Sequence, residues 1–98
     1  DDMAAGAARA AAAFPAYKDT IFVGIGGNLA GIDAILAGQE TMTVAVDGYD
    51  VGYLGVQAAV DALNGKTLEK FIATDATVVT AENAAERRAE VEKRLGTS

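Results

Sequence analysis

The chain has 98 residues and a formal net charge of −6, with 8 basic and 14 acidic residues and no cysteine, histidine or tryptophan. This acidic balance argues against nucleic-acid binding, which needs clustered Lys and Arg side chains to neutralise phosphates. The most common general base and the thiol nucleophile are missing, so we expect no enzyme and no catalytic residue. Carboxylates alone would have to hold a metal, and no segment resembles a calcium loop, so we expect neither a metal nor a cofactor.

The length of the chain suits one small domain or a piece of a larger one. No apolar run approaches the ~20 residues that a membrane-spanning helix needs. The first residues, Asp1 and Asp2, are acidic, whereas a signal peptide begins with basic residues. We therefore expect any export signal to lie upstream of this segment.

The chain begins with an alanine-rich segment that predicts a helix running to about residue 13. Asp1 or Asp2 can cap this helix, and Pro15 ends it. Residues 21–25, IFVGI, form a continuous apolar run. Such a run predicts a strand buried on both faces, as in a parallel sheet.

A glycine-rich turn, Gly26-Gly27-Asn28, follows this strand. It does not fit a dinucleotide-binding loop, because Leu29 occupies the third glycine position and no phosphate-loop lysine follows. We favour a plain strand-to-helix turn that needs glycine. Asn28 would cap a second helix that ends at Gly38. The start of that helix could still donate N–H groups to a polar ligand.

A second strand, residues 41–46, leads through Asp47-Gly48 into a helix over residues 49–63. In α/β proteins a ligand often binds beyond the carboxyl end of such a strand. Asp47 has two interpretations: a helix cap, which we favour about two to one, or a cleft residue that accepts a hydroxyl or ammonium group. Both roles are compatible.

Two short β-like runs, residues 71–73 and 76–79, precede a charged helix over residues 81–95. The mixed charges of this helix predict a solvent-facing surface. Strands that alternate with helices indicate the α/β class, with a parallel sheet flanked by helices.

Four segments resemble the C-terminal part of type I periplasmic binding proteins, the ribose-binding-like solute receptors of ABC importers. DDMAAGAARAAAA is similar to the family's N-D-[DE]-M-A-x-G-A helix start, and FVGIGGN to its V-G-[IF]-D-G-N turn. TMTVAVDGYDVGYLGVQAAVDALNGK is similar to the T-V-A-Q-D-P-Y-x-M-G-Y stretch and the helix after it, and TDATVVTAEN to the closing T-G-V-x-x-V-T-x-E-N. Their order and spacing together are specific.

The resemblance implies where a ligand would bind. The family's sugar-binding asparagine would lie just before Asp1, its aspartate corresponds to Gly26, and its glutamine corresponds to Val46. Asp47 matches the family's aspartate. The candidate ligand-binding residues are therefore Asp1, Gly26, Asn28, Val46 and Asp47. Because two polar groups are lost, we expect a small polar solute that is sugar-like or a less polar relative.

The resemblance also implies pieces of two lobes. Residues 1–46 would belong to the C-terminal lobe, residues 47–75 to a hinge crossing and a helix-strand unit of the N-terminal lobe, and residues 76–98 to a return strand and the charged C-terminal helix. The remainder of the polypeptide or a swapped copy would complete the sheets. The expected partners are the solute and ABC permease subunits, and the expected location is the periplasm or, as a lipoprotein, the cell surface.

Two other functions fit the same elements. The first is the effector-binding lobe of a lactose-repressor-type transcription regulator, which shares the fold but usually carries a V-G-[FY]-D-[DN] turn. The second is an autonomous flavodoxin-like α/β module, which predicts a folded monomer with a complete sheet.

Overall fold

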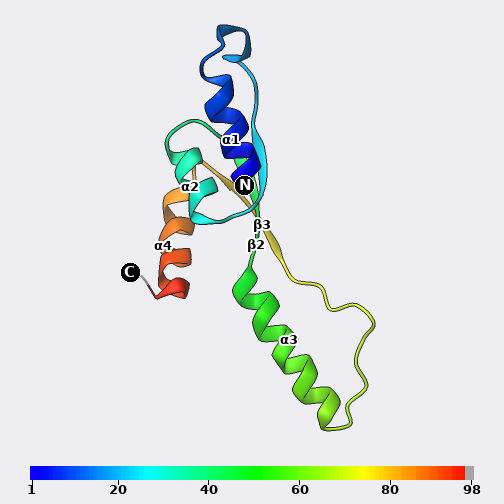
Figure 1. The fold of residues 1–98 in the computed structure, drawn as a ribbon. Helices are drawn as coiled ribbons and strands as arrows, with labels where there is room; N and C mark the ends of the chain where they lie inside the picture. Colours follow the sequence, from blue (N-terminus) through cyan, green and yellow to red (C-terminus); the bar gives the residue numbers. More distant parts are fainter. Residues whose placement is uncertain (97–98) are drawn as a thin grey trace.

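The computed structural model describes residues 1–96 of the chain (Figure 1). Within them, a three-stranded sheet is accompanied by four α-helices and one short 3-10 helix. In chain order the elements are α1 (Asp2–Ala11), η1 (Pro15–Tyr17), β1 (Val23–Gly26), α2 (Leu29–Leu36), β2 (Met42–Val46), α3 (Gly48–Leu63), β3 (Ala76–Thr80) and α4 (Ala84–Leu95). The predicted α/β class is confirmed.

The sheet has the order β1-β2-β3, and its third strand corrects the prediction of an all-parallel sheet. β1 and β2 are parallel, whereas β3 is antiparallel to β2. The reason is the path of the chain: α3 leads away from the sheet, and an extended segment returns to the end of the sheet at which β2 finishes (Figure 1). Val46, the last residue of β2, therefore pairs with Ala76, the first residue of β3.

The core lies between one face of the sheet and the helices α2 and α4. Ile32 and Ile35 of α2 pack with Ala45, Val79 and Ala84, and Val91 of α4 packs against this cluster. The prediction of a solvent-facing final helix was therefore wrong for one of its faces. Helix α4 is also tied to α2 by an ion pair between Arg88 Nε and Asp33 Oδ1, 2.7 Å apart.

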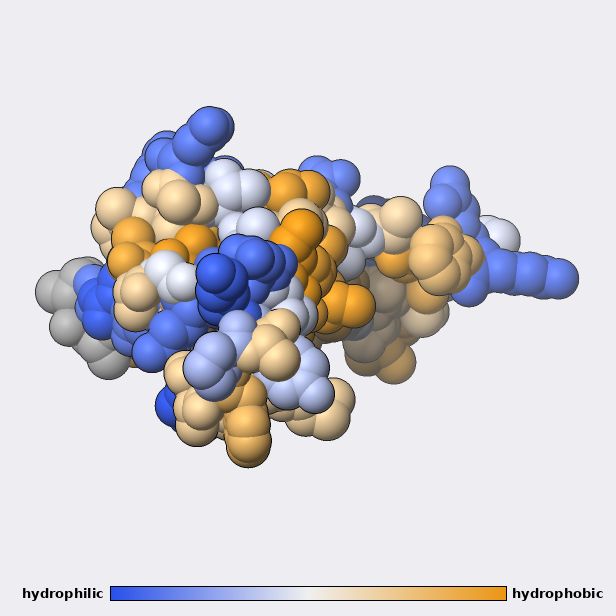
Figure 2. Space-filling model, turned by 90° about the horizontal axis from the view of Figure 1, so that it is seen from above, coloured by the Kyte–Doolittle hydropathy of each residue, from blue (hydrophilic) through white to orange (hydrophobic). Residues whose placement is uncertain are grey.

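The opposite face of the sheet is open. Val23, Ile25 and Val78 are 51%, 68% and 53% exposed. Figure 2 shows hydrophobic surface near the middle of the molecule in the view from above. The prediction that β1 is buried on both faces was wrong, because the described helices that pack on the sheet cover only the face of Gly24, Thr43, Ala45 and Val79. Exposed apolar area of this kind favours association with another polypeptide surface.

Helix α3 projects from the rest of the molecule, and none of its residues is buried (Figure 1). The Cα radius of gyration is 17.0 Å, whereas a compact domain of this length has about 13 Å. Residues 71–73, predicted as a strand, form none, and Phe71 is 79% exposed. A strand needs a neighbour to accept its backbone hydrogen bonds, and the described chain places none beside this segment.

Candidate functional site

An open pocket of about 420 Å³ lies at the carboxyl ends of β1 and β2, where they meet the start of α3 and the last turns of α4. Four of the five predicted site residues line it together. The lining residues are Gly26, Gly27, Asn28, Val46, Asp47, Gly48, Tyr49, Arg87, Val91, Arg94 and Leu95. A volume of this size is typical of small-molecule sites.

The fifth predicted residue, Asp1, is not among the lining residues; it holds the β1–α2 turn instead. Its carboxylate accepts hydrogen bonds from the backbone N–H groups of Gly27 (2.6 Å) and Asn28 (2.9 Å) and from Thr43 Oγ1 (2.5 Å). Asp1 occupies the N-cap position of α1, but its side chain makes no capping hydrogen bond there. The predicted capping role was therefore wrong for Asp1, because the carboxylate is engaged across the sheet instead.

Close contact with Asp1 explains two glycines of this region. A Cβ atom at Gly31 would lie 2.5 Å from Asp1 Cγ, and one at Gly24 would lie 2.4 Å from Asp1 Oδ1. Both distances are far below van der Waals contact. The Asp1 carboxylate can therefore occupy this position only because Gly24 and Gly31 carry no side chain.

Asn28 caps α2, as its position predicts. Its Oδ1 accepts from the backbone N–H of Gly31 at 2.9 Å, and its Nδ2 donates to Asp2 Oδ1 at 3.2 Å. Both polar atoms of the side chain thus already have partners. A ligand in the pocket would meet Asn28 beside a completed cap rather than a free amide.

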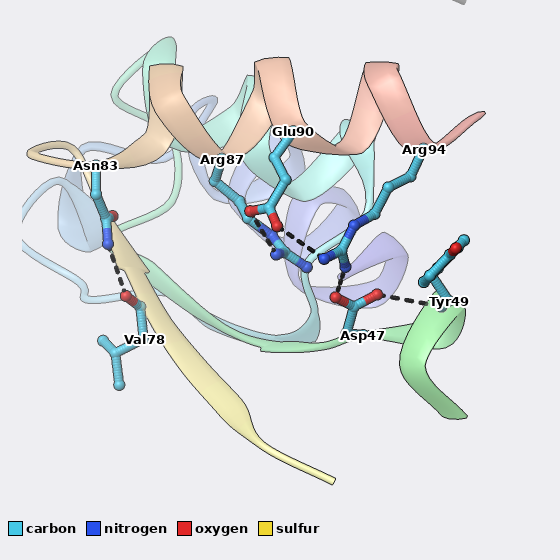
Figure 3. Close-up of polar contacts among 7 residues, drawn as sticks. All are labelled: Asp47, Tyr49, Val78, Asn83, Arg87, Glu90 and Arg94. Atoms are coloured by element: carbon cyan, nitrogen blue, oxygen red, sulfur yellow. Dashed lines mark hydrogen bonds and ion pairs between the residues drawn. The ribbon is translucent and has the colours of Figure 1, made fainter. Parts of the chain in front are cut away.

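Asp47 caps α3 and also forms an ion pair with α4. Its Oδ1 accepts from the backbone N–H of Tyr49 at 3.1 Å, and its Oδ2 contacts Arg94 Nη1 (Figure 3). Arg94 Nη2 lies 3.0 Å from Glu90 Oε1, and the Arg94 guanidinium lies over the Tyr49 ring, 5.2 Å from its centroid. The capping interpretation of Asp47 is confirmed.

The contribution of α4 to the pocket was missed at the level of sequence. Arg87, Val91 and Arg94 are spaced four and three residues apart, which places them on one helical face. Figure 3 shows the arginine side chains pointing from α4 toward the strands. Arg87 Nη1 donates to Glu90 Oε2 at 3.1 Å, while its buried Nε has no hydrogen-bond partner among the described residues. The spacing of Arg87, Val91 and Arg94 was the signal in the sequence that could have indicated this pocket-facing side of α4.

The pocket combines an apolar wall with charged side chains that already have partners. Val46, Tyr49, Val91 and Leu95 form a largely apolar wall. The Asp47 carboxylate pairs with Arg94, and Arg87 pairs with Glu90 of its own helix. In the described part of the chain, no cluster of three or more potential ligand side chains could hold a metal ion. Over the same residues, no helix combines the length and apolarity that crossing a membrane requires.

The Asp1–Thr43 contact gives a first testable prediction. Thr43 is fully buried, and replacing it with valine keeps the shape but removes the donor to a carboxylate. We expect Thr43→Val to lower the free energy of unfolding by about 1–3 kcal/mol, measured by urea denaturation. Thr41→Val, at an exposed position just before the same strand, should change it by less than about 0.5 kcal/mol. Equal effects of both substitutions would contradict the role of this hydrogen bond.

The comparisons with known proteins agree with this geometry. No protein-family model and no curated protein matches the chain. One similar solved structure is that of an ABC transporter solute-binding protein from Bacillus halodurans C-125 with bound myo-inositol, at 34% sequence identity and a TM-score of 0.80. The match covers 92% of this chain and 31% of that protein, so the chain spans about a third of its relative's length. The predicted resemblance of the chain to part of a type I periplasmic binding protein, the solute receptor of an ABC transporter, is therefore confirmed.

Proposed function

We propose that the chain is part of the substrate-binding component of an ABC importer and contributes to a cleft that binds a small polar solute. The main support is the pocket at the carboxyl ends of β1 and β2, which brings Gly26, Asn28, Val46 and Asp47 together. In α/β folds, ligands usually bind beyond the carboxyl ends of parallel strands such as these. Binding and delivery to permease subunits, in the periplasm or at the cell surface, form the proposed activity.

The proposed division into two lobes is supported by the path of the chain. Residues 1–46 and 76–98 are assigned to the C-terminal lobe and residues 47–75 to the N-terminal lobe. The two crossings, near residues 46–48 and 73–75, lie at the same end of the sheet, because Val46 at the end of β2 pairs with Ala76 at the start of β3. The unburied helix α3 is then a surface that the remainder of a solute receptor, or a swapped copy, would cover.

The chemistry of the pocket favours a solute with both apolar and polar faces. Gly26 and Val46 supply no side-chain hydrogen bond where the resemblance implies an aspartate and a glutamine. Tyr49 and Leu95 add apolar surface at the same place. A cyclic polyol such as myo-inositol, which the similar solute-binding protein holds, or a less polar relative of a sugar fits this combination.

Binding of such solutes tests the proposal directly. The complete solute receptor that contains this chain would be titrated calorimetrically with myo-inositol, ribose and glucose, and native mass spectrometry would search for a retained molecule. We expect Val46→Gln to strengthen pentose or hexose binding roughly ten-fold, because one added hydrogen bond contributes about 1 kcal/mol or more. Ala37→Gln, exposed after α2 at the other end of the sheet, is the matched control and should leave the affinity unchanged.

Failure of every polyol and sugar to bind, together with the absence of a retained solute, would overturn the proposal. The transcription-regulator alternative gains no support, since the reported structural match is to a transport protein. No second function is therefore proposed.

A further inference from the structure

We infer that Arg94 of α4 is a positioning residue: it clamps the junction between β2 and α3 and so sets the direction in which α3 leaves the sheet. The inference starts from the weak anchoring of α3. None of the sixteen residues of this helix is buried, and it projects beyond the sheet (Figure 1). Besides the pairing of Val46 with Ala76 at its base, α3 is contacted by α4 at its first turn.

Asp47 is the residue through which that first turn is held. One carboxylate oxygen accepts from the backbone N–H of Tyr49, and the other contacts Arg94. The side chain of Asp47 is only 15% exposed, so solvent screens this ion pair less than it screens a surface pair. The same carboxylate thus connects the start of α3 to the end of α4.

Arg94 reaches α3 in a second way. Its guanidinium lies over the ring of Tyr49, 5.2 Å from the centroid, in the geometry of a cation–π contact. Glu90, one turn earlier on α4, pairs with the same guanidinium at 3.0 Å. Arg94 is therefore held on its own helix while it contacts two consecutive features of the junction, the cap and the first aromatic side chain.

Helix α4 can transmit this restraint because it is fixed to the body of the molecule. Ala84 and Val91 pack on the core, and Arg88 pairs with Asp33 of α2 at 2.7 Å. A continuous series of contacts therefore runs from the core through α4 and Arg94 to Asp47 and α3. Figure 3 shows its last part, from Arg94 to Asp47 and Tyr49. If the junction is a hinge between lobes, which rests on the proposed function, Arg94 couples lobe movement to the last turn of α4.

The test measures the direction of α3 without any ligand. The chain has no cysteine, so Ala59→Cys on α3 and Ala37→Cys after α2, both exposed, can carry a unique pair of spin labels. Pulsed electron spin resonance then reports the distribution of distances between them. Dilution with unlabelled chain removes distances between copies. Circular dichroism confirms that each variant keeps its helices.

We expect Arg94→Ala to broaden the distribution and to reduce the population at the original distance about five-fold relative to other distances. Arg94→Lys keeps the charge but loses the planar contacts, so it should give an intermediate result. Lys93→Ala, exposed on the neighbouring position of α4, is the control and should leave the distribution unchanged. An unchanged distance distribution in Arg94→Ala would overturn the inference. An altered distribution, together with the failure of every solute to bind in the calorimetric test above, would count against the proposed function alone.

Discussion

Gly27→Ala is expected to have the largest effect of any single methyl group added to this chain. A Cβ atom at Gly27 would lie 2.5 Å from the Cβ and 2.7 Å from the Cα of Ala45. Ala45 is 2% exposed and belongs to the central strand, so it has no room to withdraw. The backbone of Gly27 also has φ +76°, which a residue with a Cβ adopts only with strain.

Overpacking costs about 1–3 kcal/mol and the left-handed backbone costs about 1–2 kcal/mol more. We therefore expect Gly27→Ala to lower the free energy of unfolding by roughly 2–5 kcal/mol, a large share of the stability of a small domain. Urea denaturation at one fixed protein concentration, followed by circular dichroism, measures this change.

Gly55→Ala is the matched control for Gly27→Ala. Gly55 lies inside α3, and a Cβ there would meet no heavy atom within 4 Å. Alanine favours a helix over glycine by about 1 kcal/mol, so this substitution should stabilise the chain slightly. If both variants unfolded at the same urea concentration, the proposed close approach of the turn to β2 would be wrong.

Removing the charge of Glu40 is expected to stabilise the chain at neutral pH. Glu40 is 4% exposed, and neither carboxylate oxygen has a hydrogen-bond partner among the described residues. Burial raises the pKa of this carboxyl above its ordinary value of 4.5. The charged form is thus disfavoured in the folded state.

The direction of the pH dependence follows from this pKa. Above pH 4.5 the unfolded chain releases the proton of Glu40, whereas the folded chain retains it until its raised pKa is passed. The folded state therefore binds more protons in that interval, and its stability falls as the pH rises through it. Glu40→Gln cannot ionise and should remove this part of the decline.

The measurement is a series of urea denaturation curves between about pH 4 and pH 8. Glu40→Met, which also removes the unpaired polar atoms, should gain about 1–3 kcal/mol at neutral pH. Glu69→Gln, at an exposed position of the return segment, is the control and should leave the pH profile nearly parallel to that of the unchanged chain. If the free energy of unfolding of Glu40→Gln varied with pH in parallel with that of the unchanged chain, Glu40 would be ionised at no cost in the folded state.

The features that sequence predicted well depend on neighbours in the chain. Asn28 and Asp47 were expected to cap helices, and both do so, because a cap needs only an acceptor and an N–H group two or three residues later. The same local logic placed the turn after β1 and the end of α3 near Leu63. The four pocket residues came from the resemblance together with the strand-to-helix pattern.

The features that sequence did not predict depend on distant partners. A short apolar run such as that of β3 carries no information about its direction, which the path of the preceding segment decides. Arg94 contacts Asp47 across more than forty positions, and Asp1 contacts Thr43 across 42. The burial of Glu40 likewise depends on surrounding elements, since no periodic pattern around it indicates an interior position.

The pairing of Val46 with Ala76 limits how α3 can move. The chain that leaves β2 and the chain that enters β3 are paired at this position of the sheet. The segment between them, residues 47–75, therefore has two attachments rather than one. Two adjacent attachments hinder rotation of this segment about its own long axis. Bending about one axis at the junction is then its easiest motion. In the solute receptor proposed above, this double attachment would restrict the relative motion of the two lobes to a hinge rotation at this end of the sheet.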